Sequence, residues 1–526
     1  MPLCTPYEGT KTKLVLAFDV GTTYSGISYC ILEPSQVPQV KGITKFPAQD
    51  LVHGPSKIPS VIYYDKDGAV RAIGAEALCD GMYEKAQEEA WIKVEWFKLQ
   101  FCSSNVASPN ISVNTFISPL PPEKSAVEVL ADYYKYLLSC AREFIQESVP
   151  DGESLWKSVK ANGIHFVLPH PNGWGELQQC QMRKAAIKAK LVKDRPSRYS
   201  RISFVTEGEA SLHFALSNGL PLGSVSKTNL LDVKYKEISV RRCHLEGSMF
   251  VSRRLENLLH DRLRGSKFAE DVAHMAACFD KHTKLRFKQK EEPQYIKFGA
   301  ARDNDEIHEI RFGQLKVTGD DIASCFEPAV NRIVNDIEEI IKDAPAHTVI
   351  KRVILVDGLA TNDWLYHCYH SPASTDLTKI STRSSKAVAD GAISFHLTHA
   401  VQARVVATTY GARVAISFNR FSTYHERKRH LVKFWPNGTP HLNAFSKILS
   451  KGTLLGATER RHESKQLVAR LEDLTECTME LFRYDGELLE DELYEPPAQY
   501  AWMDEEENEG MYTHSLRLFL HRLKFI

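Results

Sequence analysis

The sequence predicts an α/β protein, in which short strands alternate with helices. One observation behind this prediction is a series of apolar, β-prone runs that end at a turn or a proline, such as "LVLAFDV" and "IHFVLPHP". The other is a set of stretches between these runs in which apolar residues recur every three or four positions, as they do on one face of a helix.

The strand and helix predictions are made in chain order. Residues 125–144 are the clearest helix, because Ser125 and Glu128 have the spacing of a capping box in front of the apolar periodicity. Strands are expected at 14–20, 26–32, 60–65, 164–171 and 352–360, a strand that runs into a helix at 202–220, and further helices at 175–192, 252–265, 278–290, 325–344 and 386–401. After Gly411 short β-like runs replace the helices, and the chain closes with an acidic stretch and a basic tail.

Composition excludes several classes of function. Lys and Arg total 66 and Asp and Glu total 66, so no overall basic field favours nucleic acid as a partner. The apolar runs are far shorter than the roughly 18 residues of a membrane span, and the first residues lack the order of a signal peptide. The eleven cysteines are scattered singly, which favours reduced thiols. We expect a cytoplasmic protein, with a nuclear location as the alternative, and neither nucleic acid nor membrane as partner.

The turn in "FDVGTTYSG" is suited to phosphate. Gly21 allows close approach of the backbone, successive N–H groups form an anion-binding concavity, and the hydroxyls of Thr22 and Thr23 add donors. Asp19 is placed to hold Mg²⁺ through water. A plain hairpin turn explains the same residues equally well.

Two other patterns have weaker support. The segment 223–228, "GSVSKT", looks like the end of a P-loop, but Ser226 stands where the glycine before Lys227 should be. The basic run 425–430, "HERKRH", suits an acidic partner or a nuclear signal, and a solvated loop explains it more simply.

The ordered set of motifs between about residues 12 and 410 resembles the 70-kDa heat-shock protein family, most closely its divergent "heat-shock protein twelve" type subgroup. "LAFDVGTTYSG" is similar to the first phosphate motif, "EWFKL" to the segment with the catalytic lysine, and "FVLPHP" to the interlobe strand with its switch proline, Pro169. "VTEGEASLHFALSNGL" is similar to the segment with the phosphate-sensing glutamate, "VILVDGLATNDWL" to the adenosine loop and "KAVADGAISFHL" to the closing helix that returns to the first lobe.

This resemblance implies a two-lobed actin-like ATPase fold, built from ribonuclease-H-like subdomains, with a small β-rich C-terminal appendage. The expected boundaries are 12–220 for lobe I, 221–410 for lobe II and 411–526 for the appendage. The implied ligands are ATP or ADP with Mg²⁺. The implied site residues are Lys98 and Glu207 for catalysis, Gly21, Thr22, Thr23, Tyr24, Lys284 and Gly358 for the nucleotide, and Asp19 for the metal.

Three departures from the family pattern change the functional expectation. After Asp232 the chain continues with Val-Lys-Tyr-Lys in place of the glycine turn that closes over the phosphates, so the second phosphate loop is missing from this sequence. Either the protein lacks the loop or an incorrect gene model has deleted it. Lys234, Tyr235 and Lys236 are expected to fill the phosphate space, because side chains with a Cβ resist the positive φ angles of such a turn. The adenosine loop has Asp357 before Gly358 where the family has paired glycines, and Gly208 replaces a proline after the glutamate.

The sequence therefore predicts a chaperone-like protein that binds adenine nucleotide and hydrolyses ATP weakly or not at all, as a pseudo-ATPase with client or co-chaperone partners. The alternative is a non-catalytic scaffold on the same fold, and a small-molecule kinase is a distant third.

Overall fold

The structure is a computed structural model that describes residues 5–51, 57–102, 119–195, 200–218, 235–244, 246–345, 348, 350, 352–356, 362–368, 378–381, 386–456, 459 and 481–484. The chain divides into two compact units. The first comprises Met1–Trp174, Met182–Val233 and Arg242–Ala400, and the second comprises Gly175–Gln181, Lys234–Arg241 and Val401–Ile526.

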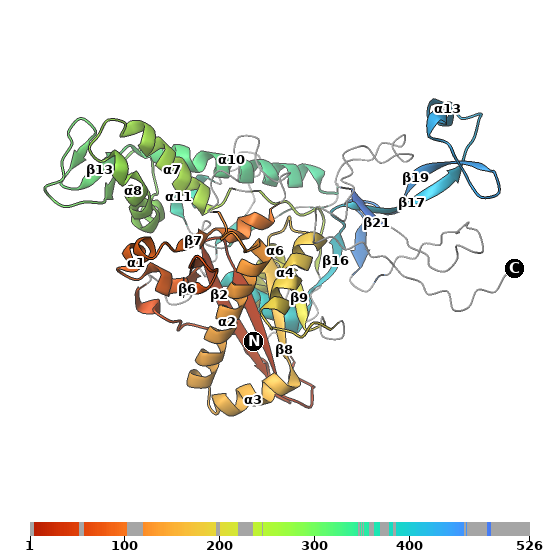
Figure 1. Ribbon diagram of the computed structural model, residues 1–526, viewed down its shortest axis with the longest axis horizontal. Helices are drawn as coiled ribbons and strands as arrows, with labels where there is room; N and C mark the ends of the chain where they lie inside the picture. Colours follow the sequence, from red (N-terminus) through yellow and green to blue (C-terminus); the bar gives the residue numbers. More distant parts are fainter. Residues whose placement is uncertain are drawn as a thin grey trace. The chain divides into compact units, whose positions relative to one another are not determined.

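A mixed sheet with the strand order β3-β2-β1-β8-β9 forms the centre of the first unit (Figure 1). Its strands are β1 (Lys13–Val20), β2 (Tyr24–Leu32), β3 (Lys41–Gly42), β8 (Ile164–His170) and β9 (Ile202–Thr206), with β4 (Ile58–Pro59) paired to β2. β2 runs antiparallel to β1, whereas β8 is parallel to both β1 and β9. This order, with an antiparallel second strand, is that of a ribonuclease-H-like subdomain, and it confirms the predicted α/β class with the actin-like lobe.

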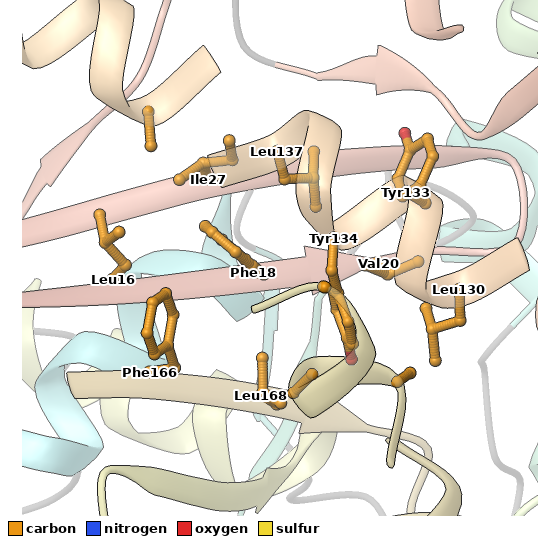
Figure 2. Packing of buried hydrophobic residues seen from close by; sticks show 14 of the residues in the cluster. Leu16, Phe18, Val20, Ile27, Leu130, Tyr133, Tyr134, Leu137, Phe166 and Leu168 are labelled. Carbon is orange, nitrogen blue, oxygen red and sulfur yellow. The ribbon is translucent and has the colours of Figure 1, made fainter. Parts of the chain in front are cut away.

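Strand β1 is buried on both faces, and its alternate residues belong to two different cores. Leu16 and Phe18 point to the core that is formed with helix α2 (Ala126–Ser148), as Figure 2 shows. Tyr134 and Leu137 of that helix pack against them, because residues three positions apart lie on the same face of a helix. The capping box of Ser125 and Glu128 begins this helix as predicted.

Helix α12 (Ala387–Thr398) covers the opposite face of the same sheet. Val15 and Ala17 of β1 pack with Ala392 and Ile393 of this helix. Gly391 is needed at the contact, because a Cβ there would lie 1.8 Å from the carbonyl oxygen of Ala210. The prediction that a helix near 386–401 returns to the first lobe is confirmed.

The remaining elements of the first unit lie around the central sheet or form a second core. Around the central sheet lie β5 (Val61–Tyr64), β6 (Val70–Ile73), β7 (Ile92–Glu95), η2 (Gly74–Leu78), η3 (Phe97–Phe101), α1 (Met82–Glu88), α3 (Gly152–Asn162), α4 (Glu176–Lys188, whose first residues belong to the second unit) and α6 (Glu207–Ser217). A second core joins α7 (Ser248–Arg262), α8 (Val272–Cys278), α10 (Gly319–Asp343), α11 (Asp363–Cys368), β11 (Gln294–Lys297), β12 (Ile310–Arg311), β13 (Gln314–Val317) and β14 (Arg352–Leu355). Strand β15 (Thr378–Ser381) pairs with β14, and α9 (Lys284–Arg286) is a short helix next to α8 in the chain. The helix expected at 278–290 is interrupted by a π-helical turn, Phe279–Thr283, and ends at Arg286.

The second unit is built from short strands, as the β-like runs after Gly411 predict. Its longest feature is the antiparallel pair β17 (Thr409–Ser417) and β19 (Pro440–Leu449), with helix α13 (Thr423–Arg427) between them in sequence (Figure 1). The other strands are β10 (Tyr235–Lys236), β16 (Val401–Val405), β18 (Lys433–Phe434), β20 (Leu454–Gly456) and β21 (Leu481–Tyr484). None of the helices in the described ranges has the length and apolar content that crossing a membrane requires.

Two histidines lie in contact between strand β8 and helix α12. The ring centroids of His165 and His396 are 4.2 Å apart. Burial, and then the charge of His396, lowers the pKa of His165 to about 3. Burial, and then the charges of His399 and Lys13, lowers the pKa of His396 to about 4.

We predict that this histidine pair makes the fold sensitive to acid. In the unfolded chain both groups bind protons near their ordinary pKa of about 6.5, whereas the folded chain does not bind them until pH 4 or below. Stability is therefore fully present above about pH 6.5 and falls as the pH drops, by up to about 1.4 kcal/mol per pH unit for each histidine. Urea-unfolding midpoints measured between pH 7 and pH 5 test this, with His396→Gln expected to flatten the dependence. An unchanged pH dependence in that variant would contradict the prediction.

Candidate functional site

The candidate site lies where three strands of the central sheet end. Strands β1, β8 and β9 run in parallel, so their carboxyl ends, at Val20, His170 and Thr206, lie at the same edge. Ligands of α/β proteins bind outside the carboxyl ends of parallel strands. The phosphate turn after β1 and the glutamate after β9 are thereby brought to one side of the sheet, although they are almost 190 residues apart in the sequence.

The phosphate turn, Gly21–Tyr24, is a tight connection held by a neighbouring serine. The Ser60 hydroxyl donates to the carbonyl oxygen of Gly21 at 2.8 Å, and the Ser60 N–H donates to the carbonyl oxygen of Thr23 at 2.8 Å. Gly21 is required by the turn, because a Cβ would lie 2.2 Å from the carbonyl oxygen of Tyr24. Within the described part of the chain the hydroxyls of Thr22 and Thr23 make no hydrogen bond, so they are available as donors.

Asp19, the predicted metal ligand, is buried next to a lysine. Its Oδ2 lies 3.3 Å from Nζ of Lys57, and the side chain of Asp19 is 5% exposed. The positive charge of Lys57 balances this carboxylate, as a bound Mg²⁺ would. The described residues also contain no group of three His, Cys, Asp or Glu side chains able to hold a metal. Asp19 fits Mg²⁺ only through water and phosphate ligands, and only when Lys57 moves away.

The two predicted catalytic residues form an ion pair. Nζ of Lys98 lies 2.6 Å from Oε1 of Glu207, and the Lys98 side chain is 10% exposed. Lys98 is placed by η3, which starts after Trp96 in the left-handed region at φ 56°, a strained conformation for a residue with a Cβ. The ring of Trp174 lies 5.7 Å from the same ammonium group, which adds a cation–π contact. The structure thus brings Lys98 and Glu207 together and satisfies each with the other.

Gly208 has a local reason to depart from proline. Its N–H donates to Oδ1 of Asn172 at 3.0 Å, and a proline has no N–H to donate. Gly208 stands in the first turn of α6, where N–H groups lack helical partners, and Asn172 comes from the segment after β8. The hydrogen bond therefore ties the ends of two parallel strands together at the site.

The Cys243 thiol lies within electrostatic range of the two predicted catalytic residues. A Cβ on Gly173 would lie 2.6 Å from Cβ of Cys243, so these two residues are in close contact. Burial raises the pKa of the Cys243 thiol, the hydrogen bond from the Gly173 N–H opposes this shift, and the charges of Glu207 and Lys98 act on it in opposite directions. Cys243 is thus within electrostatic range of Lys98 and Glu207, the two predicted catalytic residues.

The residues that follow Asp232 include a short strand. Tyr235 and Lys236, which were expected to fill the phosphate space, form strand β10, which pairs with β16 inside the second unit. A Val-Lys-Tyr-Lys run alternates apolar and polar residues, which favours a strand over a turn. Asp232 and Lys234 lie outside the described residues, and so do Asp357 and Gly358 of the adenosine loop.

Lys284, predicted to face the adenosine, is buried in a polar cluster of its own lobe. Its ammonium group donates to Oγ of Ser248 at 2.7 Å and to Oγ of Ser252 at 3.0 Å, and it pairs with the Asp280 carboxylate. Partial burial, and then the same Asp280, raises the pKa of Tyr24, so the phosphate turn lies within electrostatic range of this cluster. The π-helical turn that carries Asp280 is of a kind often found at functional sites. The role of Lys284 toward adenosine stays a prediction.

Sequence reasoning missed the residues that hold the site together. Lys57, Ser60, Asn172 and Cys243 carry no motif, and each acts through a contact that the fold creates. The one available signal was the Asn-Gly pair directly after "FVLPHP", since such a pair marks a turn at the end of a strand.

Comparisons with known proteins find similarity among solved structures. No protein-family model and no curated protein matches the chain. Among solved structures, MreB5 of Spiroplasma citri bound to ADP aligns with a TM-score of 0.41 and 12% identity, over 73% of this chain and 96% of that one. Because the identity and the TM-score are low, we assign the fold from the strand order of the present chain's own central sheet.

We predict that Lys98 and Glu207 are energetically coupled. Lys98→Met and Glu207→Gln should each destabilise the fold, because each leaves its partner, the partly exposed Glu207 or the buried Lys98, without its counter-charge. In the double variant the loss should be smaller than the sum by about 0.5–3 kcal/mol, as for residues in contact. Urea unfolding of the four proteins measures this coupling energy, and strictly additive losses would show that the ion pair does not form in solution.

Proposed function

We propose that this chain is an adenine-nucleotide-binding protein of the 70-kDa heat-shock type that hydrolyses ATP negligibly. The observation that carries the proposal is the ion pair between Lys98 and Glu207, with Cys243 beside it. A lysine that stabilises phosphate charge and a carboxylate that positions water must both be available to the substrate. In this site the two groups neutralise each other.

The phosphate turn supports nucleotide binding. Its donors are the hydroxyls of Thr22 and Thr23 and the backbone N–H groups of an exposed turn, a donor set that suits phosphate oxygens. Ser60 fixes the turn before any ligand arrives, so binding does not require ordering it. Tyr24, partly exposed and close to the Asp280 cluster, would border the nucleotide on the side of the second lobe.

The surroundings of Asp19, the predicted metal ligand, support nucleotide binding more than ATP hydrolysis. When bound, Mg²⁺ would neutralise phosphate charge, and Asp19 is the residue that would hold it through water. Lys57 now provides a positive charge at this carboxylate, 3.3 Å away. The same lysine can approach a phosphate oxygen in place of the metal, since an ammonium group is a phosphate-binding point charge.

The heat-shock assignment rests on the order of the sequence motifs, and with it we propose a chaperone-like role with client or co-chaperone partners. The alternative, a scaffold that needs no nucleotide, is favoured by one observation. Asp19, Glu207 and Asp280 are each already paired with a lysine, so the site is electrostatically satisfied without a ligand. Nucleotide binding measurements separate the two roles.

We predict that Thr22→Val combined with Thr23→Val weakens ATP and ADP binding. Two hydroxyl donors disappear with little change in volume, and each lost hydrogen bond to a charged group costs about 1.5–3 kcal/mol. Isothermal titration of the double variant measures the loss, with the exposed Thr423→Val in the second unit as the matched control. Unchanged affinity in the double variant would identify the turn as a plain hairpin and favour the scaffold role.

We further predict that the purified chain releases phosphate from ATP negligibly and that Lys98→Ala changes this rate little. Removing one transition-state donor costs about 10²–10³ in rate, and here the second phosphate loop is missing while Lys98 is held by Glu207. A malachite-green phosphate assay with each variant measures the rate. Turnover at the level of an active ATPase that Lys98→Ala abolishes would overturn the proposal.

A further inference from the structure

The hairpin of β17 and β19 carries a basic tip that the proposed function does not use. We define the tip as residues 418–436, which contain five Lys or Arg residues and a single acidic residue, Glu426. The side chains of Arg420, Arg427 and Lys433 are exposed and form no ion pair within the described part of the chain. Arg429 pairs only loosely with Glu426, at 3.4 Å, and is 75% exposed.

Two aromatic side chains stand out from the same tip. Phe421 is 82% exposed and Phe434 is 68% exposed. Their exposure is not a sign that the tip lacks structure, because His425 is buried and accepts the N–H of Asn419 at 2.8 Å. The ring of Trp435 also stacks on that of His441, with centroids 5.0 Å apart. A structured tip with outward-facing phenylalanines among cations is a surface suited to a partner that is both acidic and aromatic.

The chain itself supplies a segment of that chemistry. Residues 485–509 contain eleven Asp or Glu residues and no Lys, Arg or His. They also contain Tyr494, Tyr500 and Trp502. Carboxylates pair with Arg and Lys, and the aromatic rings can stack on Phe421 and Phe434 or on the guanidinium groups.

The segment begins close enough to reach the tip. β21 pairs antiparallel with β17, and its last residue, Tyr484, lies opposite Thr409 at the end of β17 away from the tip. The nine residues of β17 span roughly 30 Å at about 3.3 Å each. Twenty-five residues of extended chain cover roughly 80 Å, so the acidic cluster 504–509 has more than enough length to return along the strand.

We propose that the basic tip of the hairpin is a docking surface for the chain's own acidic segment, residues 485–509. The contact is a set of ion pairs around an aromatic centre. Exposed ion pairs are screened by salt, so the docked state weakens as ionic strength rises. An acidic partner protein would then have to displace the segment to reach the tip.

Zero-length carbodiimide cross-linking of the full chain tests the proposal. Amide cross-links are expected between Lys428 or Lys433 and carboxylates of 485–509, and 0.5 M NaCl should reduce their yield severalfold. A mixture of isotopically light and heavy chains shows whether they form within one chain, as the proposal requires. Absence of these cross-links, or cross-links only between different chains, would overturn it.

Variants of the full chain provide the second test. Neutralising the eleven carboxylates as amides should remove hydrogen-exchange protection from the tip, and a synthetic peptide of residues 485–509 should then bind in trans. Arg420, Arg427, Arg429 and Lys433→Gln on that background should weaken peptide binding about tenfold or more, as four exposed ion pairs are lost. The matched control replaces four exposed cations of the first unit, Lys157, Arg264, Lys281 and Lys297, by Gln and should bind normally.

The alternative ligand of a basic and aromatic tip is an anionic lipid surface. Binding to vesicles of phosphatidylserine and phosphatidylcholine tests this alternative. Vesicle binding by the neutralised chain that the tip variant abolishes, without any binding of the peptide, would overturn the proposal in favour of a lipid surface.

Discussion

The parallel pairing of β1, β8 and β9 is the constraint on which the site depends. Parallel strands end at the same edge of a sheet, so the turn after β1, the segment after β8 and the helix after β9 must meet there. The pairing is fixed by burial on both faces. Leu16 and Phe18 belong to the core under α2, whereas Val15 and Ala17 belong to the core under α12, and a register shift of one residue would exchange these sets. Position in the sheet, more than any single motif, places Gly21 and Glu207 at the same edge.

The α/β class was predictable from the sequence because its determinants are local and repetitive. The apolar run of β1, the capping box of α2 and the periodicity of α12 each indicate their own element, whereas the two-lobed topology was expected from the resemblance of the ordered motifs to the 70-kDa heat-shock family. The site was predictable only in part. Glu207 and Lys98 stand in recognisable segments. The ion pair between Asp19 and Lys57 depends on a contact between two segments, and no sequence pattern predicts that contact.

The missing loop shows where sequence reasoning reached its limit. The absence of a glycine turn after Asp232 is visible in the sequence, and the position of Cys243 is not. Tyr235 and Lys236 follow their own alternation into a strand, so the residue that contacts Gly173 comes from further along the chain. A departure from a motif therefore shows which residues a site lacks. Only the fold shows which other residues lie near that site.

The charges of the site explain why binding without turnover is physically consistent. Asp19, Glu207 and Asp280 are each matched by a lysine, so the described part of the candidate site carries pairs of opposite charge rather than a field of one sign. A triphosphate can attract a lysine from such a pair, but the carboxylate left behind then lacks its partner, which costs most free energy at the buried Asp19. Under the proposed function the net gain from a third phosphate is therefore small, and ADP and ATP are expected to bind similarly. Catalysis needs the opposite arrangement, in which donors are fixed in advance and unpaired until the transition state forms. Under the proposed function, a site whose cations are already paired would recognise a nucleotide at the phosphate turn and would lack the preorganised charge that cleaves one.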